Sequence, residues 1–224
     1  MLIVCALVGS LAGWASQTAP SGNLNHILEM MDHSARDFHT LTADIEHIKY
    51  TAVVNDTSTE LGHIYVRREG KMRIDFVKPD ERTILRLGDS LFVFTKKINR
   101  VEEYDLGKNR DLVDQYVLLG FGTKSEDVKK SYDISLLSEE TLDGQKTYVL
   151  ELIPKTDQVK KLITKIHLWI DEASWLPIQQ KFFEAGSADY LIFHYKDMKK
   201  NLKIDGDKFK QDWPKDVSRV KPRG

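Results

Sequence analysis

The feature that most constrains this chain is a hydrophobic period of two, which recurs in short segments from residue 41 onward. In residues 71–78, KMRIDFVK, apolar side chains alternate with charged ones, as expected of a strand with one buried face. Turn-forming pairs such as Pro79-Asp80 and Gly88-Asp89 separate successive segments at hairpin spacing. The pattern predicts an antiparallel meander.

The same pattern covers most of the chain and sets the fold class. We expect strands within residues 41–54, 60–68, 71–78, 82–87, 91–94, 100–104 and 131–137, around the hairpin turn at 143–144, and within 162–171, 177–184 and 190–198. A sheet of ten or more strands does not stay flat, because the twist between neighbours accumulates, so it curls toward a barrel. We therefore expect a mainly β (α+β) fold in one domain, from about residue 22 to 215.

Two segments have helical spacing instead. In residues 23–38 the apolar side chains recur at steps of three and four, and Asn23 or Asn25 can cap the first turn. Residues 108–122 show a second, shorter run of helical spacing that ends at Gly120 and Gly122. These helices are available to cover the open end of a curled sheet.

The first 15 residues, MLIVCALVGSLAGWA, are apolar and uncharged and end in small residues. They are typical of a secretory signal peptide cleaved after Ala15, although no basic residues precede the apolar stretch. A membrane anchor, a buried N-terminal helix and a lipid-modified Cys5 remain alternatives, but the segment is short for a span of about 20 residues. Because Cys5 is the single cysteine, cleavage would leave a mature chain without thiols.

Composition and motifs argue against several classes of function. The formal net charge of −1 provides no overall positive potential that would attract nucleic acid. We also expect the protein to be a monomer. The seven histidines lack metal-ligand spacing and are interpreted as surface residues, and no nucleophile or phosphate-loop motif occurs. The carboxylates of Glu102-Glu103 and of Glu139-Glu140 point to opposite faces of a strand, so neither pair can flank one bond. We expect no enzyme, no metal and no cofactor.

The apolar faces of the strands point to one common concave surface. The candidates for lining a cavity there are Ile64, Val66, Met72, Ile74, Phe76, Leu85, Leu87, Leu150, Leu152, Ile166, Leu168, Leu191 and Phe193. A barrel of this size is either filled by side chains or left with a ligand cavity. Pattern alone favours the filled core.

Arg68 is the charged residue on that face, because alternation places it with Ile64 and Val66. One interpretation puts Arg68 at the end of its strand, where the rim meets water. The other has its five N–H donors bonding to carbonyl groups of a covering helix and so latching it.

Residues 61–94, LGHIYVRREGKMRIDFVKPDERTILRLGDSLFVF, resemble the LolA family, the periplasmic carriers of outer-membrane lipoproteins. The segments LWID at 168–171, LPIQ at 176–179 and NLKIDGDKFKQDWPKDV at 201–217 fit the same family. The chain departs from the family pattern at two places. It has Glu69 where the family has proline, and it has Gly-Asp-Ser at residues 88–90 where the family has Asp-Gly-Lys.

The resemblance implies a half-open antiparallel β-barrel of about eleven strands with a helical lid. It implies a cavity for lipoprotein acyl chains and places Arg68 at the lid-latching arginine. The expected function is a periplasmic carrier that takes lipoproteins from an inner-membrane releasing transporter and delivers them to an outer-membrane acceptor. The superfamily also includes the acceptor LolB and the sensor RseB, so a lipid- or lipoprotein-sensing module that signals to a membrane partner is the alternative. A filled barrel serving as a scaffold is a third.

Overall fold

The structure is a computed structural model that describes residues 23–68, 70–107 and 119–222. The predicted signal peptide at 1–15, with Cys5, lies outside the described residues. So does most of the second predicted helix, at 108–122.

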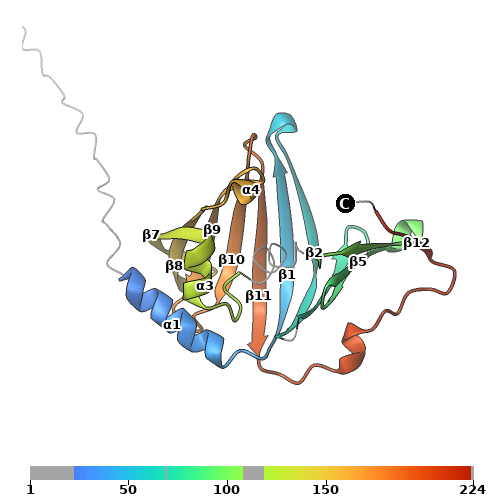
Figure 1. Cartoon of the computed structure of the whole chain (residues 1–224), viewed down its shortest axis with the longest axis horizontal. Helices are drawn as coiled ribbons and strands as arrows, with labels where there is room; N and C mark the ends of the chain where they lie inside the picture. The colour runs from blue at the N-terminus through green and yellow to red at the C-terminus, as the bar shows by residue number, and fades with distance from the viewer. Residues whose placement is uncertain (1–22, 69, 108–118, 223–224) are drawn as a thin grey trace, which may run out of the picture.

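One twelve-stranded sheet forms the body of the protein (Figure 1). Its strands are β1 (Thr40–Thr51), β2 (Asp56–Arg67), β3 (Lys71–Lys78), β4 (Arg82–Leu87), β5 (Ser90–Thr95), β6 (Arg100–Asp105), β7 (Tyr132–Leu142), β8 (Gln145–Pro154), β9 (Ile163–Asp171), β10 (Pro177–Glu184), β11 (Tyr190–Lys200) and β12 (Ser218–Val220). The predicted strand over 41–54 ends earlier, because residues 52–54 form the 3-10 turn η1 (Ala52–Val54).

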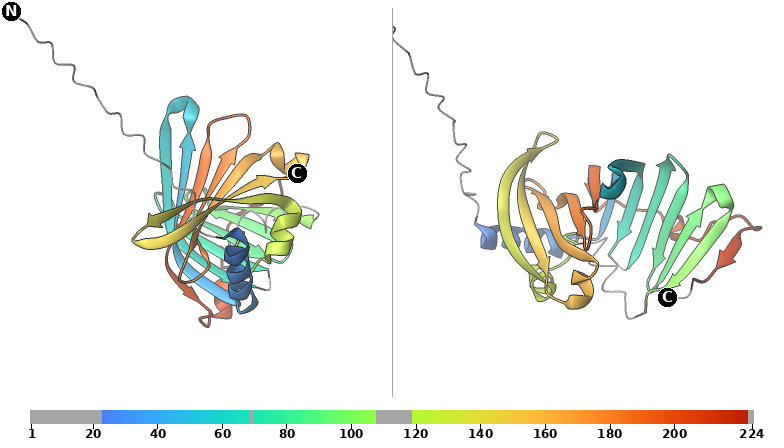
Figure 2. Two further views of the ribbon diagram at one scale, coloured as in Figure 1. Left: turned by 90° about the vertical axis from the view of Figure 1, so that its left-hand side faces the viewer. Right: turned by 90° about the horizontal axis from the view of Figure 1, so that it is seen from above.

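The strand order is β12-β6-β5-β4-β3-β2-β1-β11-β10-β9-β8-β7. All neighbours are antiparallel except β12 and β6, which are parallel. The sheet curls, yet its edge strands β7 and β12 lie on opposite sides of the molecule and do not pair, so the barrel is half open (Figures 1 and 2). The predicted fold class is confirmed. The strand beyond the expected eleven is accounted for by β12, which is only three residues long.

The described helices are α1 (Leu24–Arg36), α3 (Ser125–Ser131) and the single turn α4 (Asp157–Lys160), with 3-10 turns η2 (Lys96–Ile98) and η4 (Gly206–Phe209) besides η1. As predicted, Asn23 caps α1: its side-chain oxygen accepts a hydrogen bond from the backbone N–H of Asn25 at 2.9 Å. Hydrophobic periodicity did not predict α3, because its sequence SEDVKKS has a single large apolar residue, Val128. Residues 119–122, the described end of the predicted second helix, form turns instead.

Helices α1 and α3 cover one half of the concave face, the half built by β7 to β10 (Figure 1). Ile27, Leu28 and Met31 of α1 are buried against the inner side chains of β8 and β9. The two helices are joined through Asp32, whose carboxylate accepts hydrogen bonds of 2.6 Å from both the backbone N–H and the hydroxyl of Ser125. This contact supplies a partner for a free N–H group at the start of α3.

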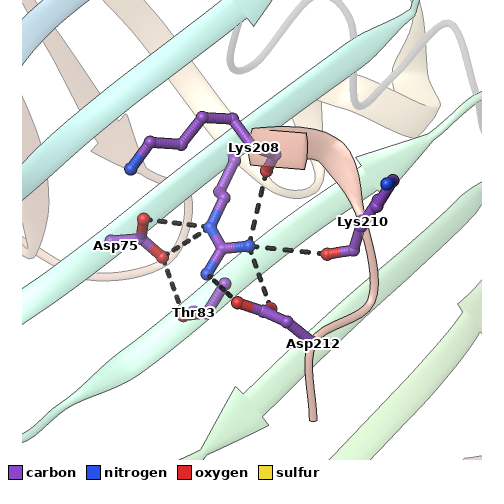
Figure 3. A network of polar contacts seen from close by, with 6 residues as sticks. Asp75, Thr83, Lys208, Lys210 and Asp212 are labelled. Carbon is purple, nitrogen blue, oxygen red and sulfur yellow. Dashed lines mark hydrogen bonds and ion pairs between the residues drawn. The ribbon is translucent and has the colours of Figure 1, made fainter. Parts of the chain in front are cut away.

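On the outer, convex face, Arg73 of β3 holds the C-terminal segment against the sheet (Figure 3). Its Nε donates to both carboxylate oxygens of Asp75 at 2.8 and 2.9 Å, and its Nη1 donates to Asp212 at 3.0 Å and to the carbonyl of Lys208 at 3.4 Å. Burial alone would lower the pKa of Arg73, but the hydrogen bonds to Asp212 and Asp75 outweigh it and the pKa is raised. The guanidinium therefore stays charged.

Candidate functional site: a cavity on the concave face

A cavity of about 190 Å³ lies on the inner face of the sheet and is lined by side chains of β1, β3, β4, β5 and β11. Strand register builds it: Ile45 lies opposite Tyr195, and Ile74 lies opposite Ile84, so each pair projects to the same side. The lining residues are Ile45, His47, Met72, Ile74, Phe76, Arg82, Ile84, Leu91, Phe193 and Tyr195. The wall is apolar apart from His47, Arg82 and the hydroxyl of Tyr195.

The other half of the concave face is packed. Beneath α1 and α3, the space between Leu28, Leu150 and Leu168 has a volume of only about 10 Å³. A space this small is about the size of one water molecule and does not admit a ligand. The interior is thus filled on the β7–β10 side and hollow on the β1–β5 side, so neither of the two arrangements considered from sequence describes all of it.

The predicted cavity residues are divided between these regions. Met72, Ile74, Phe76 and Phe193 line the cavity. Ile64 and Val66 do not line it but are buried in the hydrophobic cluster that contains Met72, Ile74 and Phe76. Leu150, Leu152, Ile166, Leu168 and Leu191 belong to the cluster that packs beneath α1.

The prediction for Leu85 and Leu87 is wrong. Leu85 lies opposite Arg73 in the sheet and therefore projects from the outer face, where both leucines pack in a cluster with Trp213 and Val217 of the C-terminal segment. In β4, RTILRL, apolar side chains occupy both alternations, and Ile84 is the one that faces inward. Apolar content alone could not decide, because the C-terminal segment gives the outer face a core of its own.

A charged cluster lies on the inner wall beside the cavity. One oxygen of Glu60, Oε2, accepts a hydrogen bond from Nδ1 of His47 at 2.9 Å and another from Nη2 of Arg82 at 2.6 Å. The His47 ring stacks on Phe193 at 4.8 Å between centroids, and the Arg82 guanidinium lies 4.8 Å from the centre of the Phe76 ring. Aromatic faces of this kind favour a nearby cation.

The environment keeps the Glu60 carboxylate ionised. Burial alone would raise the pKa of the Glu60 carboxyl, but the hydrogen bond from His47 and the charge of Arg82 outweigh it and the pKa is lowered. The interpretation of the histidines as surface residues is wrong for His47, His167 and His194, whose side chains are 17%, 13% and 10% exposed. The clue in the sequence was the pairing of the first two strands, which sets His47 directly opposite Glu60.

A buried polar contact holds residues 119–122 against the sheet. The side-chain amide of Gln180, which is fully buried, donates to the carbonyl of Leu119 at 2.7 Å, and the Tyr195 hydroxyl donates to Gln180 at 3.3 Å. Burial raises the pKa of Tyr195, so it remains a neutral donor. Gly122 has a φ of +71°, and a Cβ there would lie 2.8 Å from the Phe38 ring, so a side chain would push this segment away from Phe38.

Arg68 lies one residue beyond the end of β2 and is exposed. Its Nη1 donates to the carbonyl of Arg36, the last residue of α1, at 3.3 Å and to that of Phe38 at 3.4 Å. A cation is favourable at a helix C-terminus, but both distances exceed the usual range of about 2.7–3.2 Å. The rim position and the helix contact both occur, and the latching role stays a prediction.

A family model with the description "Uncharacterized protein" matches residues 68–213. The chain belongs to this family. An uncharacterized protein from Methanocaldococcus jannaschii is 23% identical over 189 residues, which are 84% of this chain and 51% of that protein. The chain thus spans about half the length of the curated relative.

Solved structures show the same fold at low identity. A conserved protein from Thermus thermophilus is 13% identical, with a TM-score of 0.57 over 88% of this chain and 98% of its own. MucB is also 13% identical, with a TM-score of 0.54 over 86% of this chain and 64% of its own. A LolA superfamily protein from Nitrosomonas europaea aligns at 0.43, with 16% identity over 86% of this chain and 99% of its own. The chain therefore shares its half-open barrel fold with the Thermus thermophilus protein and MucB.

The described part of this family member contains no group of three or more potential metal-ligating side chains. Within residues 23–68, 70–107 and 119–222, no helix has both the length and the apolar character needed to cross a bilayer. What the site offers chemically is an apolar wall with a few hydrogen-bonding groups at one end, which is the usual make-up of a site for a small apolar ligand.

Proposed function

We propose that this protein is a periplasmic carrier that binds the acyl chain of a lipoprotein in the concave cavity and delivers it toward the outer membrane. The observation that supports the proposal most is the apolar cavity of about 190 Å³ on the half of the sheet that α1 and α3 do not cover. The expected partners are an inner-membrane lipoprotein-releasing transporter and an outer-membrane acceptor. The proposed role is binding and transfer, not catalysis.

The size of the cavity favours one chain and reversible binding. Small-molecule sites typically measure roughly 300–1,000 Å³, so this cavity accommodates part of a single acyl chain. Burial of a methylene contributes roughly 0.8 kcal/mol, so even about ten of them give roughly 8 kcal/mol before the cost of association. A carrier needs such moderate affinity, because it must release what it binds.

Filling the cavity tests the proposal. Ile84 is a half-buried lining residue, so Ile84→Trp places a large ring in the cavity with little disturbance of the packed core. We expect binding of a fluorescent fatty-acyl probe, measured by titration, to weaken at least about tenfold while the melting temperature stays near that of the wild type.

The matched control is Val77→Trp, because Val77 is 48% exposed and follows Phe76 on the opposite face of β3. It should bind the probe as the wild type does. Equal binding by Ile84→Trp and the wild type would show that the acyl chain does not occupy this cavity.

The second candidate is a lipid- or lipoprotein-sensing module that signals to a membrane partner. The similarity in fold to MucB favours it, since MucB has been crystallised in complex with MucA. Transfer separates the two functions: a carrier loaded with a fluorescent lipopeptide passes it to acceptor vesicles, whereas a sensor retains it. Retention with unimpaired binding would favour the sensor.

A further inference from the structure

The unusual feature of the cavity wall is His47, which lines an apolar space and has one nitrogen without a partner. Nδ1 bonds to Glu60, whereas Nε2 is buried and has no hydrogen-bond partner among the described residues. An ionised carboxylate only accepts, so Nδ1 carries the hydrogen, and the ring tautomer that this hydrogen bond selects leaves Nε2 as an acceptor. A buried acceptor without a donor is costly, which makes it a strong determinant of what binds beside it.

Arg82 supplies the complementary groups. Within the described part of the chain, the one side-chain hydrogen bond of Arg82 runs from Nη2 to Glu60, so the other guanidinium N–H groups remain available at the cavity wall. Because the Arg82 charge is balanced by Glu60 at 2.6 Å, the cluster offers donors without a net positive charge. Such a site provides little attraction for a free anion.

His47 and Arg82 bond to the same oxygen of Glu60 and therefore lie close together. The polar head group of one ligand can reach both side chains. The strand ends place them at one end of the cavity: Arg82 is the first residue of β4, and the cavity continues from there along Phe76 and Ile74 toward Met72. An apolar chain lying along these side chains would have its polar end at Arg82 and His47.

We propose that this His47–Glu60–Arg82 cluster selects acyl ligands with a neutral polar head that carries an acceptor and a donor side by side. Arg82 donates to the carbonyl oxygen, and Nε2 of His47 accepts from the neighbouring N–H or O–H. An acyl amide and a monoacylglycerol share this chemistry. The inference rests on the proposed function and names the head group that the same cavity takes.

The experiment compares ligands of one chain length in the unmodified full chain. Competition against the fluorescent acyl probe is measured with myristamide, monomyristin, methyl myristate and the myristate anion. We expect the two donor-bearing ligands to bind about five- to tenfold more tightly than the methyl ester, which is the effect of one hydrogen bond. We expect the anion to bind no better than the methyl ester. A preference for one donor-bearing ligand alone would identify the amide or the glyceride as the source.

His47→Phe assigns the effect to its residue. Phenylalanine preserves the stacking on Phe193 and removes the acceptor, so the preference for the donor-bearing ligands over the methyl ester should disappear. Arg82→Met should weaken all carbonyl ligands together.

The ligand comparison in the unmodified chain decides the proposal by itself, so the test does not depend on whether a variant folds. Equal affinity of the wild type for all four ligands, or tightest binding of the anion, would overturn the head-group inference and leave the proposed acyl binding standing. Failure of every acyl ligand to bind would overturn both.

Discussion

At the scale of single residues, Arg73 connects two parts of the chain that are far apart in sequence. It bonds to Asp75 on its own strand and to Asp212 in the C-terminal segment, and its side chain is 11% exposed. Its loss leaves the Asp75 carboxylate partly buried without its cation, which is costly. We predict that Arg73→Met lowers the free energy of unfolding by about 2–3 kcal/mol, measured by urea denaturation.

The same variant should expose the C-terminal segment to protease, because Trp213 and Val217 lose the contact that holds them on the outer face. The control is Lys210→Met, since the Lys210 side chain is 70% exposed and only its carbonyl takes part in the contact with Arg73. If the two variants unfold at the same urea concentration, Arg73 does not hold the segment.

His167 on the outer face provides a pH dependence with a definite sign. Burial lowers the pKa of His167, and the nearby lysines lower it further, against the hydrogen bond to Glu151. The folded protein thus keeps the ring neutral at a pH where the unfolded chain, with a pKa near 6.5, takes up a proton. We predict that stability falls as the pH drops from about 7.5 to about 5.5, and that His167→Gln reduces this fall. An identical pH slope in the variant, measured by urea denaturation, would contradict the assignment.

At the scale of elements, Arg68 makes long hydrogen bonds to the carbonyl of Arg36, the last residue of α1, and to that of Phe38 just beyond the helix. Bonds of this kind contribute little to global stability, so Arg68→Leu should change it by no more than about 0.5 kcal/mol. We predict that hydrogen exchange in the last turn of α1 accelerates and that a bound acyl probe leaves faster.

The matched control is Arg36→Leu, which removes a positive charge from the same helix end and retains the carbonyl that Arg68 contacts. It should leave exchange and release close to those of the wild type. Wild-type exchange and transfer kinetics in Arg68→Leu would exclude the latching role.

Elements with one clear apolar face could be predicted from sequence, and those without one could not. In β3 the inward Met72, Ile74 and Phe76 alternate with polar residues, and the structure has the strand at the predicted residues. In β4 both faces are apolar, so the facing of Leu85 required knowledge of the distant C-terminal segment. For α3, the ordering contact is the side chain of Asp32, which periodicity does not reveal.

At the scale of the whole molecule, the barrel has two unequal halves. The helices fill one half, and the cavity occupies the other. Sequence alternation identified the inner face as a whole, but not which part of it α1 covers, because helix placement depends on contacts between segments far apart in the chain. The His47–Glu60–Arg82 cluster was missed for the same reason, since Arg82 lies two strands away from Glu60.

The proposed function requires that this half-open barrel carry an acyl chain in the cavity between β1 and β5. Native mass spectrometry of the full chain, purified from the periplasm of an expression host without added lipid, tests this directly. We expect a population heavier by the mass of one acyl species, which organic extraction releases and which Ile84→Trp lacks. Repeated absence of any such adduct on the wild type, or the same adduct on Ile84→Trp, would contradict the proposal.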